Sequence, residues 1–462
     1  MPADRIDIDE RWIERALQEA SDTRLLRIEH GARHQAALAI DRLFGQRPVI
    51  IVADVNTFSA AGRDVFDALR HAGHRCIEPF VFEQSELHAD YEHVETLEKA
   101  LAPHDATPVA VGSGTINDLT KLASHHLGRP YLVVATAASM DGYAAFGASI
   151  THHGSKQTFD CPAPMGILAD LEVIESAPEG MNASGYADLL AKSVAGADWL
   201  VADALDVEPI DDTAWDMVQS RLRVWLADPA ALQRGDPKAV RSLILGLVMS
   251  GFAMQRTKTS RPASGADHQF SHLWDMQHHV HQGKSPSHGF KVGIGTLASS
   301  ALYEELLLQS LDELDVDRLC LQWPEFASVE ADIRERFDLP DLAAKALEET
   351  RAKYIDRQCL RDQLMRIRTA WPQLHRRLRS HLIPYGELKD CLAAAGCPSA
   401  PHEIGISYER LRENYLQAYY IRRRFTVLDL AVRTALLSSA LERIFGSQGR
   451  WPTAETGISH NL

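Results

Sequence analysis

Residues 47–57 read RPVIIVADVNT, and this stretch indicates the fold class. Val49 to Val52 form a short run without a polar side chain, which is typical of a strand buried on both faces of a parallel sheet. Asp54 follows at the carboxyl end of that strand. Because ligands of parallel α/β sheets bind outside the carboxyl ends of the strands, the stretch predicts both a buried strand and a place for a functional carboxylate.

The stretches around this strand alternate between helical and strand-like patterns. We predict helices over 57–72 and near 92–102, with strands over 75–82 and 108–111. Such alternation predicts an α/β domain built on a parallel sheet. From Ala183 onward most segments have helical periodicity, so an all-helical region is expected to follow.

These patterns divide the chain of 462 residues into three parts. The first is a helical N-terminal extension over 1–45, and the second is the α/β domain over 46–180. The third is an all-helical domain over 181–462, whose tail after Trp451 is expected to be poorly ordered. A composition of 45% hydrophobic residues provides enough material for two packed cores.

The charge and the cysteines narrow the class of protein. A net charge of -15 argues against a nucleic-acid partner, which would need clustered Lys and Arg. The six scattered cysteines are typical of a reduced, cytoplasmic protein. The N-terminus is polar and acidic, unlike a secretory signal, and no apolar run approaches the ~20 residues that span a bilayer. We therefore expect no membrane insertion, and the sequence leaves a homodimer open.

A histidine-rich stretch at 264–295 reads SGADHQFSHLWDMQHHVHQGKSPSHGFKVGIG. His268 and His272 are four residues apart, so a helix would present both imidazoles on one face. His288 follows on a predicted loop, immediately before Gly289. A histidine pair at helical spacing with a later histidine indicates half of a divalent-metal site, which needs a carboxylate or thiolate from elsewhere. The other histidines of the stretch are interpreted as solvent-exposed, namely His278, His279 and His281.

Asp188 is the carboxylate that could complete this set. It stands in the sequence GYADLLAK at the head of an apolar segment, where a buried charge needs a partner. Lys192, one helical turn on, is the structural alternative. With His268 and His288, Asp188 would supply three protein ligands and leave one coordination position open, which is the arrangement of a catalytic metal site. His272 would then face the same cavity, where its imidazole could bind substrate or relay a proton.

The loop Gly112–Asp118, GSGTIND, lies between a predicted strand and a helix. Its two glycines would let the backbone approach a phosphate, which a helix N-terminus favours. The dinucleotide fingerprint is incomplete because Asn117 stands in place of its third glycine, so a phosphate cradle and a plain tight turn both remain open. Asp54 favours the cradle, since its carboxylate could accept the ribose hydroxyls of NAD and repel the extra phosphate of NADP. A helix cap or a surface turn is the alternative role for Asp54.

The loop Thr136–Gly142, TAASMDG, ends the next predicted strand. Its small residues and hydroxyls suit close contact with a nicotinamide or a ribose. Asp141 could bind a substrate hydroxyl. Helix capping by Ser139 or Asp141 is the alternative interpretation.

In this order and with this spacing, the motifs resemble those of the glycerol-1-phosphate dehydrogenases. They are Asp54 after a strand, GSGTIND with Lys121, TAASMDG, GYADLLAK, SGADHQFSH and SHGFKVGIGTL, and they cover residues 47–300. That family belongs to the superfamily of iron-type alcohol dehydrogenases, glycerol dehydrogenases and dehydroquinate synthases. The resemblance implies a dehydroquinate-synthase-like fold, in which an α/β NAD(P)-binding domain with a parallel sheet precedes an all-α metal-binding and substrate-binding domain.

The resemblance also implies roles for individual residues. Asp188, His268 and His288 would bind one divalent metal, with zinc or nickel the usual ion. Asp141 and His272 would be catalytic and would contact the substrate, which Asp188 could touch as well. The implied cofactor contacts are Asp54, Gly112, Gly114, Thr115, Ile116, Asn117, Asp118, Thr136, Ala137, Ala138 and Ser139.

The implied reaction is the reversible NAD(P)-linked reduction of dihydroxyacetone phosphate to sn-glycerol 1-phosphate, which serves phospholipid biosynthesis. NADH, preferred over NADPH because of Asp54, would give a hydride to the carbonyl carbon while the metal polarises the carbonyl oxygen. Ala187 and Phe290 depart from residues common in the family, and they bear on the substrate rather than on the metal. The candidates for binding the substrate phosphate are Lys156, Lys258 and Arg261.

Three alternatives to this reaction remain open. Two are enzymes on the same frame: a related polyol dehydrogenase acting on an unphosphorylated substrate, or a dehydroquinate-synthase-like enzyme. The third is a metal- and nucleotide-binding protein without turnover.

Overall fold

The computed structural model of the chain describes residues 3–84, 87–152, 155–178 and 180–453. The chain forms two compact units. The first consists of Met1–Lys192, Asp211–Ala263 and Ala394–Cys397, and the second of Ser193–Ile210, Ser264–Ala393 and Pro398–Leu462. From residue 454 on, the tail that was expected to be poorly ordered lies outside the described residues.

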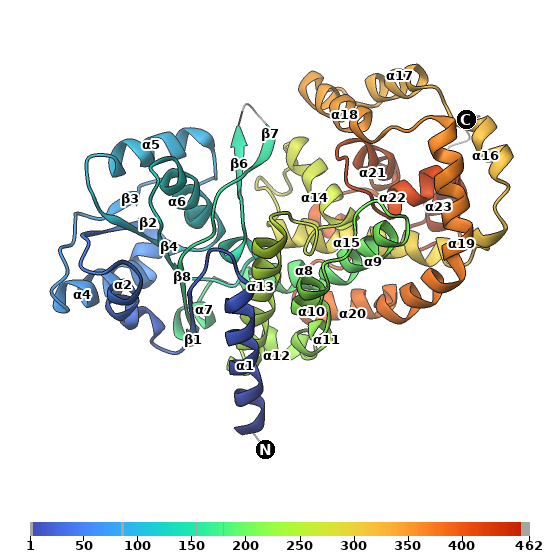
Figure 1. Cartoon of the computed structure of the whole chain (residues 1–462). Helices are drawn as coiled ribbons and strands as arrows, with labels where there is room; N and C mark the ends of the chain where they lie inside the picture. Colours follow the sequence, from blue (N-terminus) through green and yellow to red (C-terminus); the bar gives the residue numbers. More distant parts are fainter. Residues whose placement is uncertain (1–2, 85–86, 153–154, 179, 454–462) are drawn as a thin grey trace. The chain divides into compact units, whose positions relative to one another are not determined.

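The first unit is built on a six-stranded sheet with the strand order β1-β8-β5-β4-β2-β3 (Figure 1). Every neighbouring pair is parallel, so the predicted α/β fold with a parallel sheet is confirmed. The strands are β1 (Leu25–Glu29), β2 (Val49–Asp54), β3 (Phe80–Phe82), β4 (Thr107–Gly112), β5 (Leu132–Ala135) and β8 (Gly166–Asp170).

The central strands are hydrophobic because both faces of the sheet are covered. On one face, alternate residues such as Val49 and Ile51 pack with α2 (Ala36–Phe44) and α4 (Arg63–His71). The residues between them point to the other face, where helices α5 and α6 pack against each other (Figure 1). Those two helices span Tyr91–Leu101 and Gly114–His126.

The N-terminal prediction is wrong for residues 25–29. The expected helical extension contains α1 (Ala3–Glu19), η1 (Ala32–Gln35) and α2, but LLRIE forms β1 and pairs in parallel with β8. Buried and exposed residues alternate only from Leu26 to Glu29. So short a pattern does not distinguish a strand from a helix, and the pairing partner lies far along the chain.

Other elements differ from the prediction in their extent. The predicted helix over 57–72 is divided into α3 (Val55–Thr57), the π-helical η2 (Phe58–Gly62) and α4. Of the predicted strand over 75–82, only β3 and a bridge between Cys76 and Val49 form. The remaining elements before the helical region are η3 (Gly142–Ala144), the antiparallel pair β6 (Ala148–His152) and β7 (Ser155–Phe159), and α7 (Leu171–Glu175).

Helices follow the sheet, as predicted, but the first unit extends beyond the predicted boundary at residue 180. Its later helices are α8 (Met181–Leu190), α10 (Asp212–Gln219), α11 (Leu222–Trp225), α12 (Pro229–Gln233) and α13 (Pro237–Thr257). Among the described residues, α13 is the one helix long and apolar enough to span a membrane by length and composition. Because 72% of its apolar stretch is buried inside the protein, α13 has the character of a core helix.

The second unit consists of helices in the residues that the structure describes, as predicted for the C-terminal part of the chain. Helices α14 (Ala266–Met276) and α15 (His288–Leu306) pack against each other. The Trp274 indole N–H donates to Oδ1 of Asn414 (2.7 Å), and the Tyr415 hydroxyl donates to the Ala298 carbonyl (2.8 Å). The other elements are α9 (Lys192–Ala204), η4 (Leu311–Glu313), α16 (Val316–Gln322), α17 (Phe326–Arg336), α18 (Pro340–Lys353), α19 (Arg357–His381), α20 (Tyr385–Ala394), η5 (Pro401–Ile404), α21 (Tyr408–Tyr420), α22 (Val427–Arg433) and α23 (Leu437–Phe445).

Gln255, near the end of α13, ties the N-terminal segment to a loop of the first unit. Its side chain is fully buried. The amide oxygen accepts hydrogen bonds from the backbone N–H groups of Asp22 (3.1 Å) and Thr23 (3.2 Å). The amide nitrogen donates to the Thr23 hydroxyl (2.9 Å) and to the carbonyl of Ala144 (2.7 Å). The loop that follows Asp141 is therefore held partly by residues that precede β1.

Replacing Gln255 with methionine should destabilise the first unit. Methionine has a similar volume but leaves several buried N–H and C=O groups without their hydrogen bonds, each at a cost of about 1–3 kcal/mol. We expect the midpoint of thermal unfolding to fall by on the order of 5–10 °C. The control is Gln358→Met, because Gln358 is exposed and its amide donates to Asp362 (3.2 Å) at the surface. Equal midpoints for the two variants would contradict a bridging role for Gln255.

Candidate active site

Helix α14 presents two of the predicted histidines in the second unit. His268 is 6% exposed, His272 is half-buried, and their ring centroids lie 6.1 Å apart. The helix begins at Ala266, whose N–H donates to Oδ2 of the fully buried Asp198 (2.7 Å). The four-residue spacing therefore places the two imidazoles on one face of the helix, as predicted.

His288 is the first residue of α15 and not part of a loop as predicted. Ser287 caps the helix by accepting the N–H of Phe290 (3.3 Å), which is why the helix begins at His288. The His268 and His288 ring centroids lie 5.3 Å apart. The three histidines of the second unit thus lie close together on two packed helices.

Asp188 lies in α8 of the first unit, and its side chain is fully buried. The Nζ atom of Lys192 lies 2.7 Å from Oδ1 of Asp188 and 2.9 Å from Oδ2 of Asp141. The backbone N–H of Asp141 donates to Oδ2 of Asp188 (3.0 Å), and the Ser250 hydroxyl donates to Oδ2 of Asp141 (2.8 Å). The structural alternative for Asp188, an ion pair with Lys192, is therefore present, and it includes Asp141 as well.

Lys192 stays charged in this buried cluster. Burial lowers the pKa of Lys192, but the carboxylates of Asp141 and Asp188 outweigh that effect and raise it above its ordinary value. Lys192 is therefore a cation that contacts both Asp141 and Asp188. Burial, followed by the same two carboxylates, also raises the pKa of Tyr143, so its phenol stays protonated.

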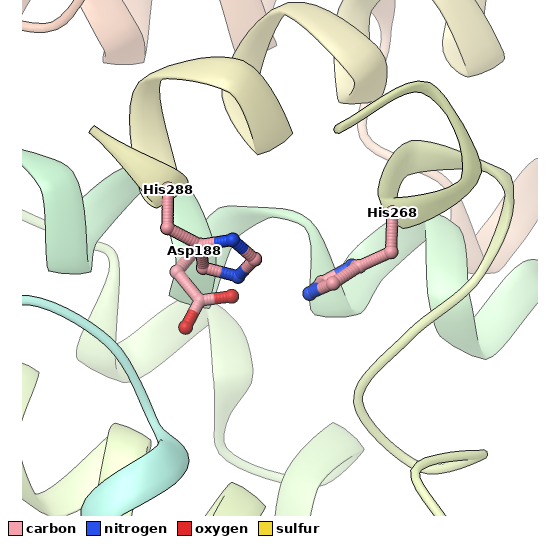
Figure 2. Close-up of side chains that lie close together, drawn as sticks. All are labelled: Asp188, His268 and His288. Atoms are coloured by element: carbon pink, nitrogen blue, oxygen red, sulfur yellow. The ribbon is translucent and has the colours of Figure 1, made fainter. Parts of the chain in front are cut away.

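One ligand atom from each of Asp188, His268 and His288 lies within 4.8 Å of the others (Figure 2). Among the residues that the structure describes, no other three histidine, cysteine or acidic side chains meet in this way. One carboxylate and two imidazoles are a suitable donor set for a divalent transition metal or zinc, with coordination positions left open. The residues present thus fit the predicted ion. Asp188 belongs to the first unit and the histidines to the second, so a shared ion is a proposal and not an observation.

The remaining histidines of the stretch differ from one another. His278 is exposed and His281 is half-buried. His279 is buried, so the prediction that it faces solvent is wrong. Its Nε2 contacts the Ile404 carbonyl (2.6 Å) and its Nδ1 contacts the Arg410 guanidinium (2.9 Å), and burial lowers the pKa of the ring. His279 therefore has a structural role that depends on residues more than 120 positions away.

The predicted phosphate loop begins helix α6 at Gly114. A Cβ atom at Gly112 would lie 2.5 Å from Cβ of Ile116, and one at Gly114 would lie 2.5 Å from Sδ of Met140. The hydroxyls of Ser113 and Ser139 lie 2.7 Å apart, which joins this loop to the loop after β5. The tight turn therefore needs glycine at position 112 for close packing, whereas at Gly114 the flexible Met140 side chain would have to move. A turn of this kind at a helix N-terminus also remains suitable for a phosphate.

The side chains at the end of that motif are turned into the protein. Oδ1 of Asn117 accepts the hydroxyl of Tyr131 (2.8 Å), and Oδ1 of Asp118 lies 3.4 Å from Nζ of Lys121. Burial raises the pKa of Asp118, although Lys121 counteracts it. Ile116 is buried as well, whereas Thr115 is half-buried. A cofactor contact in this part of the motif would therefore come from the backbone or from Thr115.

Lys121 fixes the segment that follows Asp141. Its fully buried ammonium donates to the carbonyls of Gly142 (2.8 Å), Ala145 (3.0 Å) and Gly147 (2.8 Å). The resemblance described above includes Lys121 with the GSGTIND motif but implies no role for it. Its role in the structure is to hold the loop that carries Asp141 against α6.

Helix α8 packs directly on the loop Thr136–Ser139. A Cβ atom at Gly185 would lie 1.8 Å from the carbonyl oxygen of Ala138, so only glycine allows this approach. The Ser184 hydroxyl donates to the Ser139 carbonyl (3.2 Å), and the Ala138 N–H donates to Oδ1 of Asn182 (3.3 Å). The helix that carries Asp188 and the predicted nucleotide loop therefore form one packed structure. Within this loop, Thr136 donates its N–H to the Gly112 carbonyl (3.1 Å), and Ala137 is buried.

Asp54 ends β2 and caps the short helix α3. Its Oδ1 accepts the N–H of Thr57 (2.8 Å), and the Thr57 hydroxyl accepts the N–H of Asp54 (3.0 Å). The alternative role as a helix cap is thus observed. Because that hydrogen bond uses one carboxylate oxygen, it does not oppose a second role at the carboxyl end of the sheet.

Sequence reasoning missed several residues that hold the candidate site. Ser250 and Asp198 carry no local signal, since their partners are distant in the chain. Asp267 adjoins His268 in the sequence and contacts it through its carboxylate, so it could have been found. Of the phosphate candidates, Lys258 pairs with Asp22 (3.2 Å) and Arg261 is fully buried. Lys156 lies in β7.

Part of the first unit is similar to the iron-containing alcohol dehydrogenases. Residues 27–178 match the family described by that name. The fold is similar to glycerol dehydrogenase from Schizosaccharomyces pombe (TM-score 0.58, 15% identity, 92% of this chain and 91% of that chain covered). It is also similar to maleylacetate reductase from Agrobacterium tumefaciens (TM-score 0.57, 16% identity, 92% and 97% covered). At these identities the likeness defines the fold alone.

More similar sequences are named glycerol-1-phosphate dehydrogenase [NAD(P)+]. That of Halalkalibacterium halodurans is 38% identical over 258 residues, which covers 55% of this chain but only 65% of the relative. That of Geobacillus thermodenitrificans is 32% identical, with 62% of this chain and 71% of the relative covered. The relative from Pyrococcus furiosus is 33% identical, with 57% of this chain and 73% of the relative covered. The chain belongs to the glycerol-1-phosphate dehydrogenase family.

Replacing Gly185 with alanine should displace the loop Thr136–Ser139. The added methyl group would overlap a backbone oxygen, which cannot rotate away as a side chain could. Overpacking of this kind costs about 1–3 kcal/mol or more, and the midpoint of thermal unfolding should fall. Gly386→Ala is the matched control, because an added Cβ there meets nothing within 4 Å. A Gly185→Ala variant as stable as the control would contradict the observed packing.

Proposed function

We propose that the protein is a metal-dependent, NAD(P)-linked glycerol-1-phosphate dehydrogenase that interconverts dihydroxyacetone phosphate and sn-glycerol 1-phosphate. The observation that carries the proposal is the group formed by Asp188, His268 and His288 in a chain of this family. The names of the relatives supply the substrate and the use of NAD(P). The alcohol dehydrogenase family and the parallel sheet supply the frame on which such chemistry occurs.

The cofactor in this proposal lies at the carboxyl ends of β2, β4 and β5. The turn at Gly112 and Gly114 would receive the pyrophosphate, since the N-terminus of α6 favours an anion. The loop Thr136–Ser139 would lie against the nicotinamide and its ribose. We propose that the carboxylate of Asp54 accepts the ribose hydroxyls through the oxygen that does not cap α3, which makes NADH the preferred cofactor.

The metal in this proposal is held by Asp188, His268 and His288, and zinc or nickel is the expected ion. When bound, a divalent cation would polarise the carbonyl oxygen of the substrate, and the reduced nicotinamide would supply the hydride. The carboxylates of Asp141 and Asp188, which share the single ammonium of Lys192, favour a cation at this place. Lys192 also fixes the orientation of the Asp188 carboxylate through Oδ1.

Asp141 and His272 are proposed to act on the substrate directly. Ser250 and Lys192 both bind Oδ2 of Asp141, which orients the carboxylate for a substrate hydroxyl. In the reduction, the carbonyl carbon gains the hydride and the carbonyl oxygen gains a proton. The imidazole of His272, half-buried one turn from His268, is placed to pass that proton from solvent.

We propose a cytoplasmic location for this activity. All six cysteines are free thiols, and several of them are buried, which suits a reducing compartment. The product would then be available to enzymes that build phospholipids from a glycerol phosphate backbone.

Metal-loaded protein should oxidise NADH when dihydroxyacetone phosphate is added, and chelator-treated protein should not. His268→Ala and Asp188→Asn should each lower kcat/KM at least about 100-fold, because charge stabilisation by a bound cation contributes several kcal/mol. His278→Ala is the control, since that histidine is exposed in the same stretch. The rate is followed by NADH absorbance, and the product is analysed by chiral chromatography.

The same assay distinguishes the alternatives. Activity on dihydroxyacetone or glycerol that equals activity on the phosphorylated ketose would indicate a polyol dehydrogenase. Stabilisation by NAD and metal without turnover of any ketose would indicate a binding protein. Full activity of both ligand variants would show that the site is assigned to the wrong residues.

Asp54→Asn should weaken the preference for NADH over NADPH by about tenfold, corresponding to ~1.4 kcal/mol. The amide can still accept the N–H of Thr57, so the cap persists while the charge that repels the extra phosphate of NADPH is lost. The ratio of kcat/KM for the two cofactors measures the effect. Asp211→Asn, which alters the N-cap of α10, is the control. A wild-type enzyme that prefers NADPH would contradict the role of Asp54.

A further inference from the structure

The residue before His268 is a buried acid whose carboxylate contacts the imidazole of His268. Asp267 lies in the first turn of α14 and is fully buried. Its Oδ2 contacts Nδ1 of His268. Successive side chains on a helix diverge by about 100°, so adjacent residues rarely touch. The contact therefore means that the carboxylate and the imidazole lean toward each other.

The backbone around Asp267 is fixed from two directions. A Cβ atom at Gly295 would lie 2.2 Å from the carbonyl oxygen of Asp267, so α15 meets α14 at this residue. On the preceding residue, the N–H of Ala266 is held by Asp198 (2.7 Å). Asp198 also accepts the N–H of Val427 (2.8 Å) and the hydroxyl of Tyr303 (2.5 Å). The carboxylate of Asp267 is thus presented from a rigid part of the second unit.

This contact determines which nitrogen of His268 is available. An ionised carboxylate only accepts hydrogen bonds, so the proton of the neutral imidazole must reside on Nδ1. The lone pair then belongs to Nε2. A carboxylate behind a metal-bound imidazole also makes it a stronger donor and prevents rotation of the ring.

We propose that Asp267 is a positioning residue for the metal site, which holds His268 in the tautomer and orientation that offer Nε2 to the ion. This inference rests on the proposed assignment of His268 as a ligand. Asp267 acts through His268 and takes no part in the coordination itself. It deepens the proposed function by adding a fourth residue on which metal affinity depends.

The test is the Zn²⁺ affinity of the full-length, chelator-stripped protein, measured by competition with a chromophoric chelator. Asp267→Asn should lower the affinity about 10- to 100-fold, because the amide can accept the same hydrogen bond but carries no charge. Asp267→Ala should lower it by at least as much. Asp332→Asn is the control, since Asp332 binds Arg336 and the Tyr420 hydroxyl elsewhere in the second unit. It should leave the affinity unchanged.

A double substitution separates positioning from a general effect on the fold. If Asp267 acts through His268, Asp267→Asn should lower the Zn²⁺ affinity in the wild-type background but not in a His268→Ala background. The absorption spectrum of the Co²⁺-loaded protein should also change in Asp267→Asn, as expected for an altered ligand orientation. Equal losses in both backgrounds would overturn the inference, because they would show a structural effect independent of His268.

The outcomes distinguish this inference from the proposed function. If the His268→Ala and His288→Ala variants bind Zn²⁺ as tightly as the wild type, the metal site itself is overturned. A different result would overturn only the role of Asp267. In that case both histidine variants lose Zn²⁺ affinity, but the Asp267→Asn variant keeps the wild-type Zn²⁺ affinity and the wild-type Co²⁺ spectrum. The melting temperature of the metal-free Asp267→Asn variant should equal that of the metal-free wild type, since the side chain keeps its shape and its hydrogen bond.

Discussion

The buried charges of Asp141, Lys192 and Asp188 are the constraint on which the first unit's part of the candidate site depends. Removing an ion from water costs several kcal/mol even after relaxation, so each member of the cluster needs partners in good geometry. Ser250 and the backbone N–H of Asp141 complete that geometry. A packed apolar cluster would often be as stable. The charges are therefore better explained by the proposed roles of Asp141 and Asp188 toward a cation and a polar substrate than by stability.

The loop that carries Asp141 is fixed by three helices rather than by its own sequence. Lys121 of α6 binds its carbonyls, Gly185 of α8 allows close contact with Ala138, and Gln255 of α13 binds Ala144. A site built on such supports varies little in geometry, which the proposed transfer of a proton and a hydride would require. The predicted nucleotide loop and the predicted substrate carboxylate belong to one continuous segment, so a shift of one would displace the other.

Local patterns determined what the sequence could reveal. The apolar strand before Asp54, the pair of Asp188 with Lys192 and the spacing of His268 and His272 are all set by neighbours within a few residues. The strand over 25–29 was missed because its identity comes from pairing with β8. Ser250 was missed for the same reason, since it meets Asp141 across 109 positions. The order of the motifs indicated the family. The burial of the site residues and their partners far along the chain could be seen only in the structure.

The C-terminal helices, for which the sequence suggested no role, provide the support of the histidine-bearing helix. Asn414 of α21 binds the Trp274 indole, and Thr426 donates to Oε1 of Gln269 (3.0 Å). Both partners lie on α14, within six residues of His268. A buried polar group left without its hydrogen bond costs about 1–3 kcal/mol, so a displacement of α14 would be opposed at several points. Residues 408–433 thus contribute to the geometry of the histidines without contributing a ligand, and a change in them is expected to act on the site through α14 and through α15, where Tyr415 binds the Ala298 carbonyl.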